Sequence, residues 1–126
     1  MRAKVLLYRL DEESERGSRV RAVLREMKIL ALTVDETQLD ETVGRLAALN
    51  AAPAEHPSVP ESIPQEPFML LCGLGGRQLD RLLAALRRAD AVVDYRAVMT
   101  DSNRGWTLCQ LMREVAREHN TINNSR

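Results

Sequence analysis

Apolar residues along the chain fall into two alternating patterns. Two nearly continuous apolar runs, AKVLLYRL at residues 3–10 and FMLLCGL at residues 68–74, are typical of strands that are covered on both faces. Shorter apolar runs at residues 30–34 and 91–100 predict two further strands. After each strand, apolar residues recur every three or four positions, which predicts helices. The predicted helices cover residues 11–29, 38–49, 75–90 and 103–120.

This order of elements predicts an α/β fold. We expect a three-layer α/β/α sandwich around a four-stranded, largely parallel sheet that is built from two βαβα halves. The two halves are also weakly similar in sequence, since KVLLYRL at residues 4–10 aligns with FMLLCGL at residues 68–74. Duplication of one unit and convergence on the same unit both explain this similarity.

The five prolines of the chain all lie between residues 50 and 67. Proline lacks the N–H that helices and strands need, so this segment is expected to be an extended connector. We interpret residues 1–120 as a single α/β domain that contains the connector, and residues 121–126 as a polar tail that frays. The connector is interpreted as a surface loop, with a lid or a proline-rich ligand as the alternative.

Composition narrows the possible partners. The formal net charge is zero, which gives no bias toward polyanions, and only 3% of the residues are aromatic, too few for stacking on single-stranded bases. We therefore expect no nucleic-acid partner. Because no apolar run is long enough to span a bilayer and no signal peptide is evident, we also expect no membrane partner. Two cysteines, Cys72 and Cys109, indicate a cytoplasmic protein with reduced thiols.

Side chains suited to catalysis are few. Neither His56, in the connector, nor His119, near the C-terminus, is a convincing base for either cysteine, so no catalytic residue is assigned. We expect no metal site and no cofactor. Four arginines on the third predicted helix are interpreted as its solvated side, although a one-sided basic surface would favour nucleic acid again. They are Arg77, Arg81, Arg87 and Arg88.

In open parallel sheets, ligands bind at the carboxyl ends of the strands. By this rule Asp11, after the first strand, and Gly75, in the GLGG turn after the third strand, are candidate binding residues. Each also has a simpler interpretation. An acidic residue at a helix start is a common cap, and GLGG lacks the spacing of a dinucleotide or P-loop motif, so it is expected to be a tight turn more than an anion site.

The stretch VMTDSNRGWTLCQLM at residues 98–112 is the strongest candidate for a site. Thr100 ends the predicted fourth strand, and Ser102 or Asn103 is expected to cap the last helix. Gly105 then lies in the first helical turn, where glycine is unfavourable unless another backbone or a ligand comes close. Trp106 is expected either to plug the end of the sheet or to form the wall of a pocket.

The same stretch carries a resemblance. Ala97, Val98, Met99 and Thr100, followed by Asn103 and Trp106, form an AVxTxxNxxW pattern at a strand end. Together with the GL…LD.LL.AL segment at residues 73–86, this pattern resembles a family of small bacterial and archaeal proteins that is known only as a domain of unknown function. Members typically carry an aromatic residue after the glycine and a proline between the threonine and the asparagine, where this chain has Leu74 and Asp101–Ser102. The resemblance implies no activity, cofactor or catalytic residue, but it singles out Thr100, Asn103 and Trp106.

These observations lead to two functional hypotheses. The first is a non-enzymatic module that binds a partner protein or a small-molecule ligand and forms a homodimer or weak oligomer. The alternative is a small enzyme or nucleotide-binding protein that uses the carboxyl ends of the strands. The alternative requires Asp11, Asp35, Gly75, Thr100 and Asn103 to converge on one open pocket.

Overall fold

The computed structural model describes residues 2–124, and the side chains of residues 2–120. The sheet consists of β1 (Lys4–Tyr8), β2 (Leu30–Val34), β3 (Phe68–Cys72) and β4 (Tyr95–Val98). The helices are α1 (Glu15–Glu26), α2 (Val43–Ala48), α3 (Gly76–Arg88) and α4 (Leu108–Asn124), with a short 3₁₀ helix at Glu36–Gln38. This confirms the predicted α/β fold with a four-stranded, largely parallel sheet.

The strand order is β2-β1-β3-β4. β1 is parallel to β2, and β3 is parallel to β4, but the two pairs meet through an antiparallel contact in which Leu6 lies opposite Leu70. Each half therefore forms its own parallel pair, and the centre of the sheet is antiparallel. This arrangement reverses the direction of one half relative to the other.

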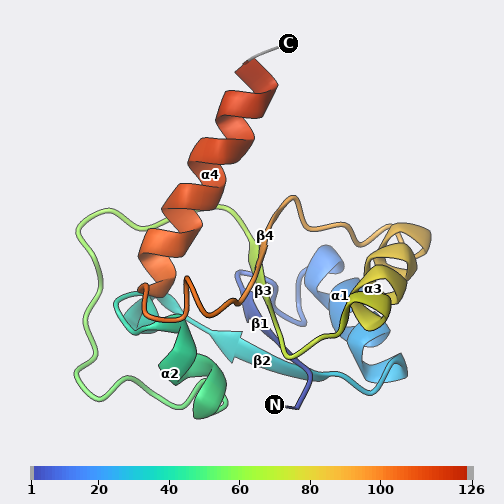
Figure 1. Ribbon diagram of the computed structural model, residues 1–126, viewed down its shortest axis with the longest axis horizontal. Helices are drawn as coiled ribbons and strands as arrows, with labels where there is room; N and C mark the ends of the chain where they lie inside the picture. The colour runs from blue at the N-terminus through green and yellow to red at the C-terminus, as the bar shows by residue number, and fades with distance from the viewer. Residues whose placement is uncertain (1, 125–126) are drawn as a thin grey trace.

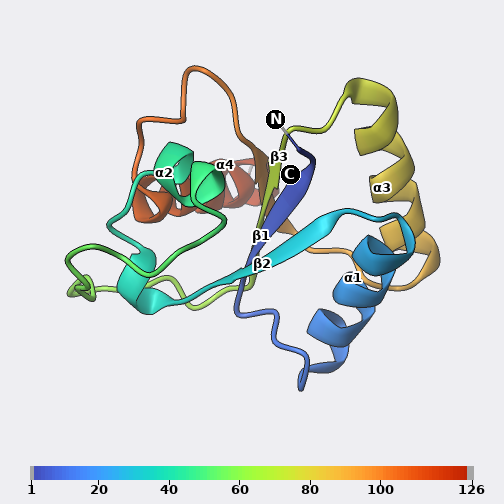
Figure 2. The same ribbon diagram turned by 90° about the horizontal axis from the view of Figure 1, so that it is seen from below.

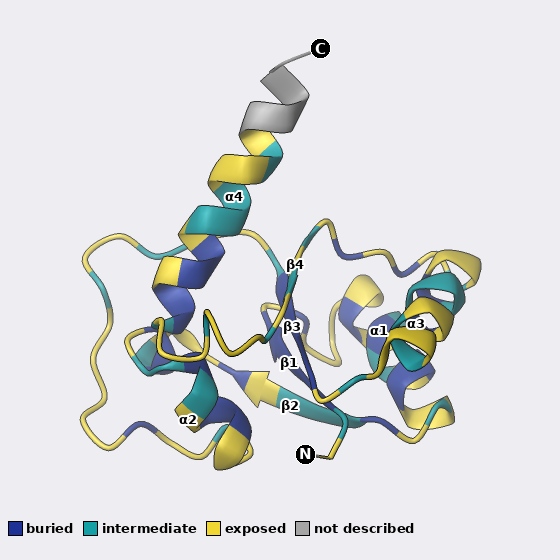
Figure 3. Cartoon of the chain, in the orientation of Figure 1, coloured by how far each residue is buried: buried dark blue, intermediate teal, exposed yellow. Residues whose placement is uncertain are grey.

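Two helical layers cover the sheet, as Figures 1 and 2 show, with α1 and α3 on one face and α2 and α4 on the other. The continuous apolar runs of β1 and β3 supply both cores, because successive side chains of a strand point to opposite faces. Leu6 and Leu70 pack with α2 and α4, whereas Leu7 and Leu71 pack with α1 and α3. Both strands are entirely buried (Figure 3).

The two halves repeat each other in structure as well as in element order. The residue after each first strand has a positive φ, 55° at Arg9 and 72° at Gly73. The second residue after each first helix also has a positive φ, 59° at Lys28 and 53° at Asp90. These positive φ angles recur at equivalent positions of the two βαβ units. The two halves are therefore similar in backbone conformation as well as, weakly, in sequence.

The predicted start of the second helix, at residue 38, is wrong, because α2 begins at Val43. Asp35 caps the 3₁₀ helix, and the Gln38 side chain accepts a hydrogen bond from the Asp35 amide at 3.0 Å, which closes a capping box. The buried Gln38 amide also donates to the carbonyls of Ala51 and Ala52. The chain leaves the helical path at this box, and α2 begins only after Thr42.

The predicted start of the last helix at residue 103 is also wrong. Neither Ser102 nor Asn103 caps α4. Thr107 does so instead, because its hydroxyl accepts from the Gln110 amide at 3.1 Å while the Gln110 side chain accepts from the Thr107 amide at 2.9 Å. At its other end α4 continues to Asn124, through four residues that the sequence assigned to a tail, and residues 125–126 lie outside the described part of the chain.

The connector at residues 50–67 crosses the outer side of the α2–α4 layer (Figure 1). Side chains outside the connector hold its backbone in place. Besides the Gln38 bonds to Ala51 and Ala52, the Tyr8 hydroxyl donates to the Pro64 carbonyl and the Arg113 guanidinium donates to the Ser62 carbonyl, each at 2.8 Å. The segment contains no helix or strand. It is an ordered surface strap rather than part of either repeat.

Candidate functional site

The antiparallel centre of the sheet separates the residues that were expected at strand ends. Asp11 follows β1 and Asp35 follows β2, whereas Gly75 follows β3 and Thr100 follows β4. Because β1 and β3 run in opposite directions, the strands of the first half and those of the second half have their carboxyl ends on opposite sides of the sheet, at opposite ends of the strands. Asp11 and Asp35 therefore do not share one site with Gly75 and Thr100.

Thr100 and Asn103 bond mainly to each other. The Asn103 side-chain oxygen accepts from the Thr100 amide at 2.8 Å, and the Thr100 hydroxyl accepts from the Asn103 amide at 3.2 Å. The Asn103 side-chain nitrogen donates to the carbonyl of Val98 at 3.0 Å. This carbonyl faces away from β3, because it is the neighbouring Met99 amide that bonds to Leu71. Asn103 thus closes a turn and satisfies a backbone group at the free edge of β4.

Gly105 lies in the loop before α4 rather than in its first turn. A Cβ atom added at Gly105 would meet nothing within 4 Å, so the fold makes no use of its small size. In this region a close backbone approach occurs instead at Gly44, where an added Cβ would lie 2.9 Å from the carbonyl oxygen of Arg104. The structure thus explains a glycine that the sequence did not single out.

Trp106 takes part in the fold through its backbone and leaves its ring partly exposed. Its carbonyl accepts from the Val43 amide at 2.9 Å, and its side chain is 39% exposed. The ring borders a shallow depression along α4 that Gln110, Arg113 and Arg117 also line. Trp106 therefore forms a wall of this depression and does not plug the sheet.

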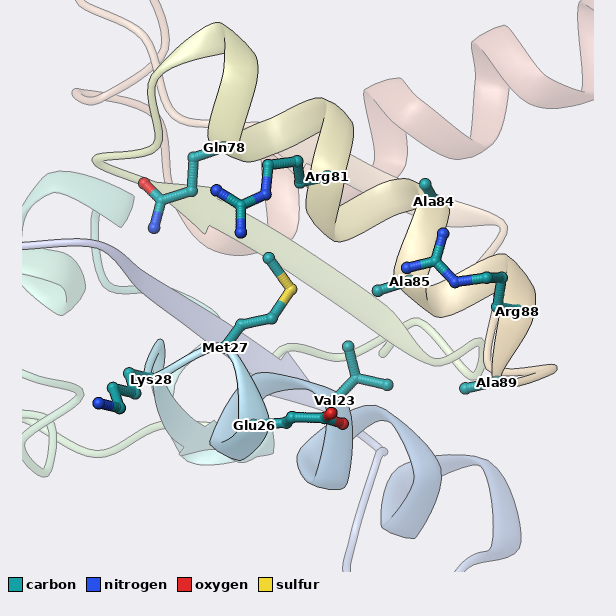
Figure 4. A pocket seen from close by; sticks show the side chains of 10 residues that line it. All are labelled: Val23, Glu26, Met27, Lys28, Gln78, Arg81, Ala84, Ala85, Arg88 and Ala89. Carbon is teal, nitrogen blue, oxygen red and sulfur yellow. The ribbon is translucent and has the colours of Figure 1, made fainter.

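A larger hollow lies in the opposite layer, between α1 and α3. It has a volume of about 690 Å³, and Figure 4 shows the side chains of the two helices that face it. Its floor is apolar and belongs to the margin of the core, with Val23 of α1 and Ala85 of α3, and with Met27 and Ala89 at the ends of these two helices. We call this hollow the α1–α3 groove.

Cationic side chains dominate the rim of the α1–α3 groove. Lys28, Arg81 and Arg88 line it together with one carboxylate, Glu26. Within residues 2–120, none of the three cations lies within salt-bridge distance of a carboxylate. The groove thus combines an apolar floor with a net positive rim.

The arginines of α3 do not all face one way. Arg81 and Arg88 line the α1–α3 groove, whereas Arg87 lines a hollow of about 80 Å³ with Val92 and Arg96. The expectation that all four arginines form the solvated side of the helix does not contain this division. The signal was present in the spacing, because Arg81, Ala85, Arg88 and Ala89 share a face of a helix that has small residues between its charges.

The thiols offer little chemistry. Burial raises the pKa of Cys72 to about 11, against a weaker opposite effect of Lys4, and burial also raises the pKa of Cys109. Both cysteines are free and buried.

Among the described residues, no three His, Cys, Asp or Glu side chains gather in a way that could hold a metal ion. No helix in this same part of the chain combines the length and the apolar character needed to cross a membrane.

Comparisons with known proteins point to one family. No curated protein and no solved structure matches the chain. A family model does match it from just before β3 to near the end of α4, a segment that corresponds to the second βαβα repeat. Over residues 67–122 the chain is similar to the family described as a domain of unknown function, DUF3783.

Proposed function

We propose that the protein is a cytoplasmic, non-enzymatic binding module whose α1–α3 groove holds an acidic amphipathic helix of a partner protein. The observation that carries this proposal is the combination of an apolar floor and unpaired cations in one groove. Amphipathic helices bind in this mode by placing an apolar stripe in a groove and polar residues along its rim.

The floor of the groove suits an apolar stripe. Val23 is buried, and Met27, Ala85 and Ala89 are half-buried, so a bound helix would complete a core margin that α1 and α3 leave open. Alanine side chains allow a third helix to approach closely, at the short end of the usual interaxial distances of about 8–10 Å. Methionine adapts its shape to the partner that it meets.

The rim favours acidic residues on the partner. The two arginines Arg81 and Arg88 lie on the α3 side, whereas Lys28 and Glu26 on the α1 side offset each other, so glutamates along one flank of the apolar stripe would meet the arginines. Such complementary charges increase the rate of association and select against basic partners. They also make the affinity sensitive to salt.

The dimensions and composition of the groove favour a helix over a nucleic acid. Its α3 wall extends from Gln78 to Ala89, about 17 Å at 1.5 Å per residue, which accommodates roughly three helical turns. No aromatic side chain lines the groove, and recognition of single-stranded bases normally uses aromatic stacking.

A designed peptide tests the proposal directly. We would measure the binding of a fluorescent peptide of about 18 residues, long enough to form a helix, with leucines at positions i, i+3, i+4 and i+7, glutamates beside this stripe and alanines elsewhere. Micromolar binding is expected, with chemical-shift changes in α1 and α3. The double variant Arg81→Glu/Arg88→Glu should weaken binding by at least about tenfold, since each reversed charge costs on the order of 1 kcal/mol.

Two controls distinguish the groove from general charge effects. Arg87→Glu changes the same charge on the same helix but lies outside the groove, so it should leave the affinity nearly unchanged. A peptide with lysine in place of glutamate should not bind. Equal loss of binding in Arg87→Glu, or no binding by the acidic peptide, would contradict the proposal. A homodimer that is lost only in the double variant would assign the groove to a second copy of the chain instead.

A further inference from the structure

A second hollow lies on the other side of the sheet, under the proline-rich strap. Its volume is about 240 Å³, below the range of about 300–1,000 Å³ that drug-sized ligands occupy. Ile63 and Pro64 of the strap, Phe68 and Tyr95 at the strand starts, and Met112 of α4 supply its walls. We call it the strap pocket.

Charged side chains of opposite sign stand at the strap pocket. Arg113 of α4 and Glu66 of the strap both line it, and both are exposed. Within residues 2–120 the two form no salt bridge with each other or with any other residue. One donor of Arg113 reaches the Ser62 carbonyl, which leaves its other N–H groups available.

We propose that the strap pocket binds a free amino acid with an apolar side chain. Such a ligand carries a carboxylate for the Arg113 guanidinium and an ammonium group for the Glu66 carboxylate. Its side chain would lie against Phe68, Met112 and Ile63. A guanidinium–carboxylate contact is a charge-assisted hydrogen bond, which is stronger than a neutral one.

Contacts around the strap pocket limit the size of a ligand that it could hold. The strap is held over it by the Tyr8 and Arg113 hydrogen bonds to Pro64 and Ser62. On the α4 side, the Tyr95 ring lies against the His119 ring with 4.8 Å between centroids. These contacts bound the pocket on two sides, and this second site is independent of the α1–α3 groove.

Isothermal titration of the full chain with leucine and phenylalanine tests the proposal. We expect saturable binding of one ligand per chain. N-acetyl-leucine lacks the positive charge and leucinamide lacks the negative charge, so each should bind at least about tenfold more weakly, as expected for the loss of a hydrogen bond to a charged group. Absence of binding by both amino acids, or equal binding of N-acetyl-leucine and leucine, would overturn the proposal.

Variants locate the site. Glu66→Gln should weaken leucine binding without disturbing the strap, because Glu66 makes no hydrogen bond or salt bridge among the described residues. Arg113→Gln should abolish it but also removes the contact to Ser62, so its melting temperature must be measured in parallel. Arg117→Gln is the matched control, since Arg117 lies one turn further along α4 and does not line the pocket. Leucine binding that survives in both Glu66→Gln and Arg113→Gln would place the ligand elsewhere and refute the assignment.

Discussion

Thr42 and Thr107 form an antiparallel bridge, and each is the N-cap residue of a helix. The amides of Val43 and Leu108, the first residues of α2 and α4, donate across this bridge to the carbonyls of Trp106 and Glu41, each at 2.9 Å. The next amides do the same, from Gly44 to Arg104 and from Cys109 to Leu39, again at 2.9 Å. Each helix start therefore satisfies its free N–H groups with the loop that precedes the other helix.

This arrangement predicts that the two caps contribute similarly to stability. Thr42→Ala and Thr107→Ala should each lower the free energy of unfolding by about 1 kcal/mol, because each removes one hydroxyl acceptor of a helix amide. Urea denaturation measures both values. Serine at either position keeps the acceptor and should restore most of the loss. An alanine variant as stable as the original protein would contradict the role of that threonine.

Gly44 and Gly105 should respond differently to alanine. At Gly44 the new Cβ would press on the Arg104 carbonyl, so we expect a loss of about 1–3 kcal/mol, more than the gain of about 0.5–1 kcal/mol that alanine brings to a helix. At Gly105 the space is open, so the change should stay within about 0.5 kcal/mol. Comparison of the two denaturation midpoints tests this order, and a reversed order would show that the loop does not dock on α2.

Asn103→Ala should destabilise the protein by about 0.5–1.5 kcal/mol, because it removes the hydrogen bonds to the Thr100 amide and the Val98 carbonyl, two exposed groups that water can still reach. The informative comparison is Asn103→Asp, which keeps the acceptor for Thr100 but loses the donor to Val98. It should fall between the original protein and the alanine variant. Affinity for the acidic peptide should not change, and a change would show that Asn103 takes part in binding.

Lys4 is a buried cation that bonds to the end of α2. Its ammonium donates at 2.7 Å both to the Ala47 carbonyl and to the Asn50 side chain. Lys4→Met keeps the apolar stem but leaves these acceptors unpaired, so we expect a loss of about 1–3 kcal/mol in unfolding free energy. Asn50→Ala removes only one of the two acceptors and should cost less. A stable Lys4→Met variant would show that water replaces the ammonium.

The buried thiol of Cys72 should make the protein less stable at alkaline pH. Burial raises its pKa from 9.0 to about 11 in the folded protein, so the folded state favours the neutral thiol. Below about pH 9 both states keep the proton, so the free energy of unfolding does not depend on this thiol's titration. It falls progressively as the pH rises from about 9 to about 11, by up to about 3 kcal/mol, because the unfolded state then loses its proton more readily than the folded state. Denaturation of the original protein and Cys72→Ala between pH 7 and pH 11 measures this, and parallel curves for the two proteins would contradict it.

The alternation of apolar runs was enough to predict most of the fold. Strand side chains point alternately to two faces, so continuous apolar runs such as those around Leu6 and Leu70 indicated strands buried between two helical layers. These patterns depend on residues that are close in sequence. The repeated βαβα order and the connector at residues 50–67 could be predicted for the same reason, since they too depend on local patterns, of apolar residues and of prolines.

The candidate site was much less predictable. The sequence placed Asp11 and Gly75 at strand ends correctly, but it could not show that β1 and β3 are antiparallel, because strand pairing depends on contacts between residues that are far apart. Nor could it show that Thr107 rather than Asn103 begins α4, since the decisive partners of that helix start lie near Leu39 and Glu41.

The sequence by itself thus determined the order of strands and helices and the burial of the two continuous apolar strands, because local periodicity encodes them. Only the tertiary structure decided which strand ends meet, which threonine caps which helix, and that Arg81 and Arg88 face a groove while Arg87 does not. The physical reason is that hydrogen-bond partners and exposed grooves arise when the two repeats pack against each other, and no single repeat contains that information.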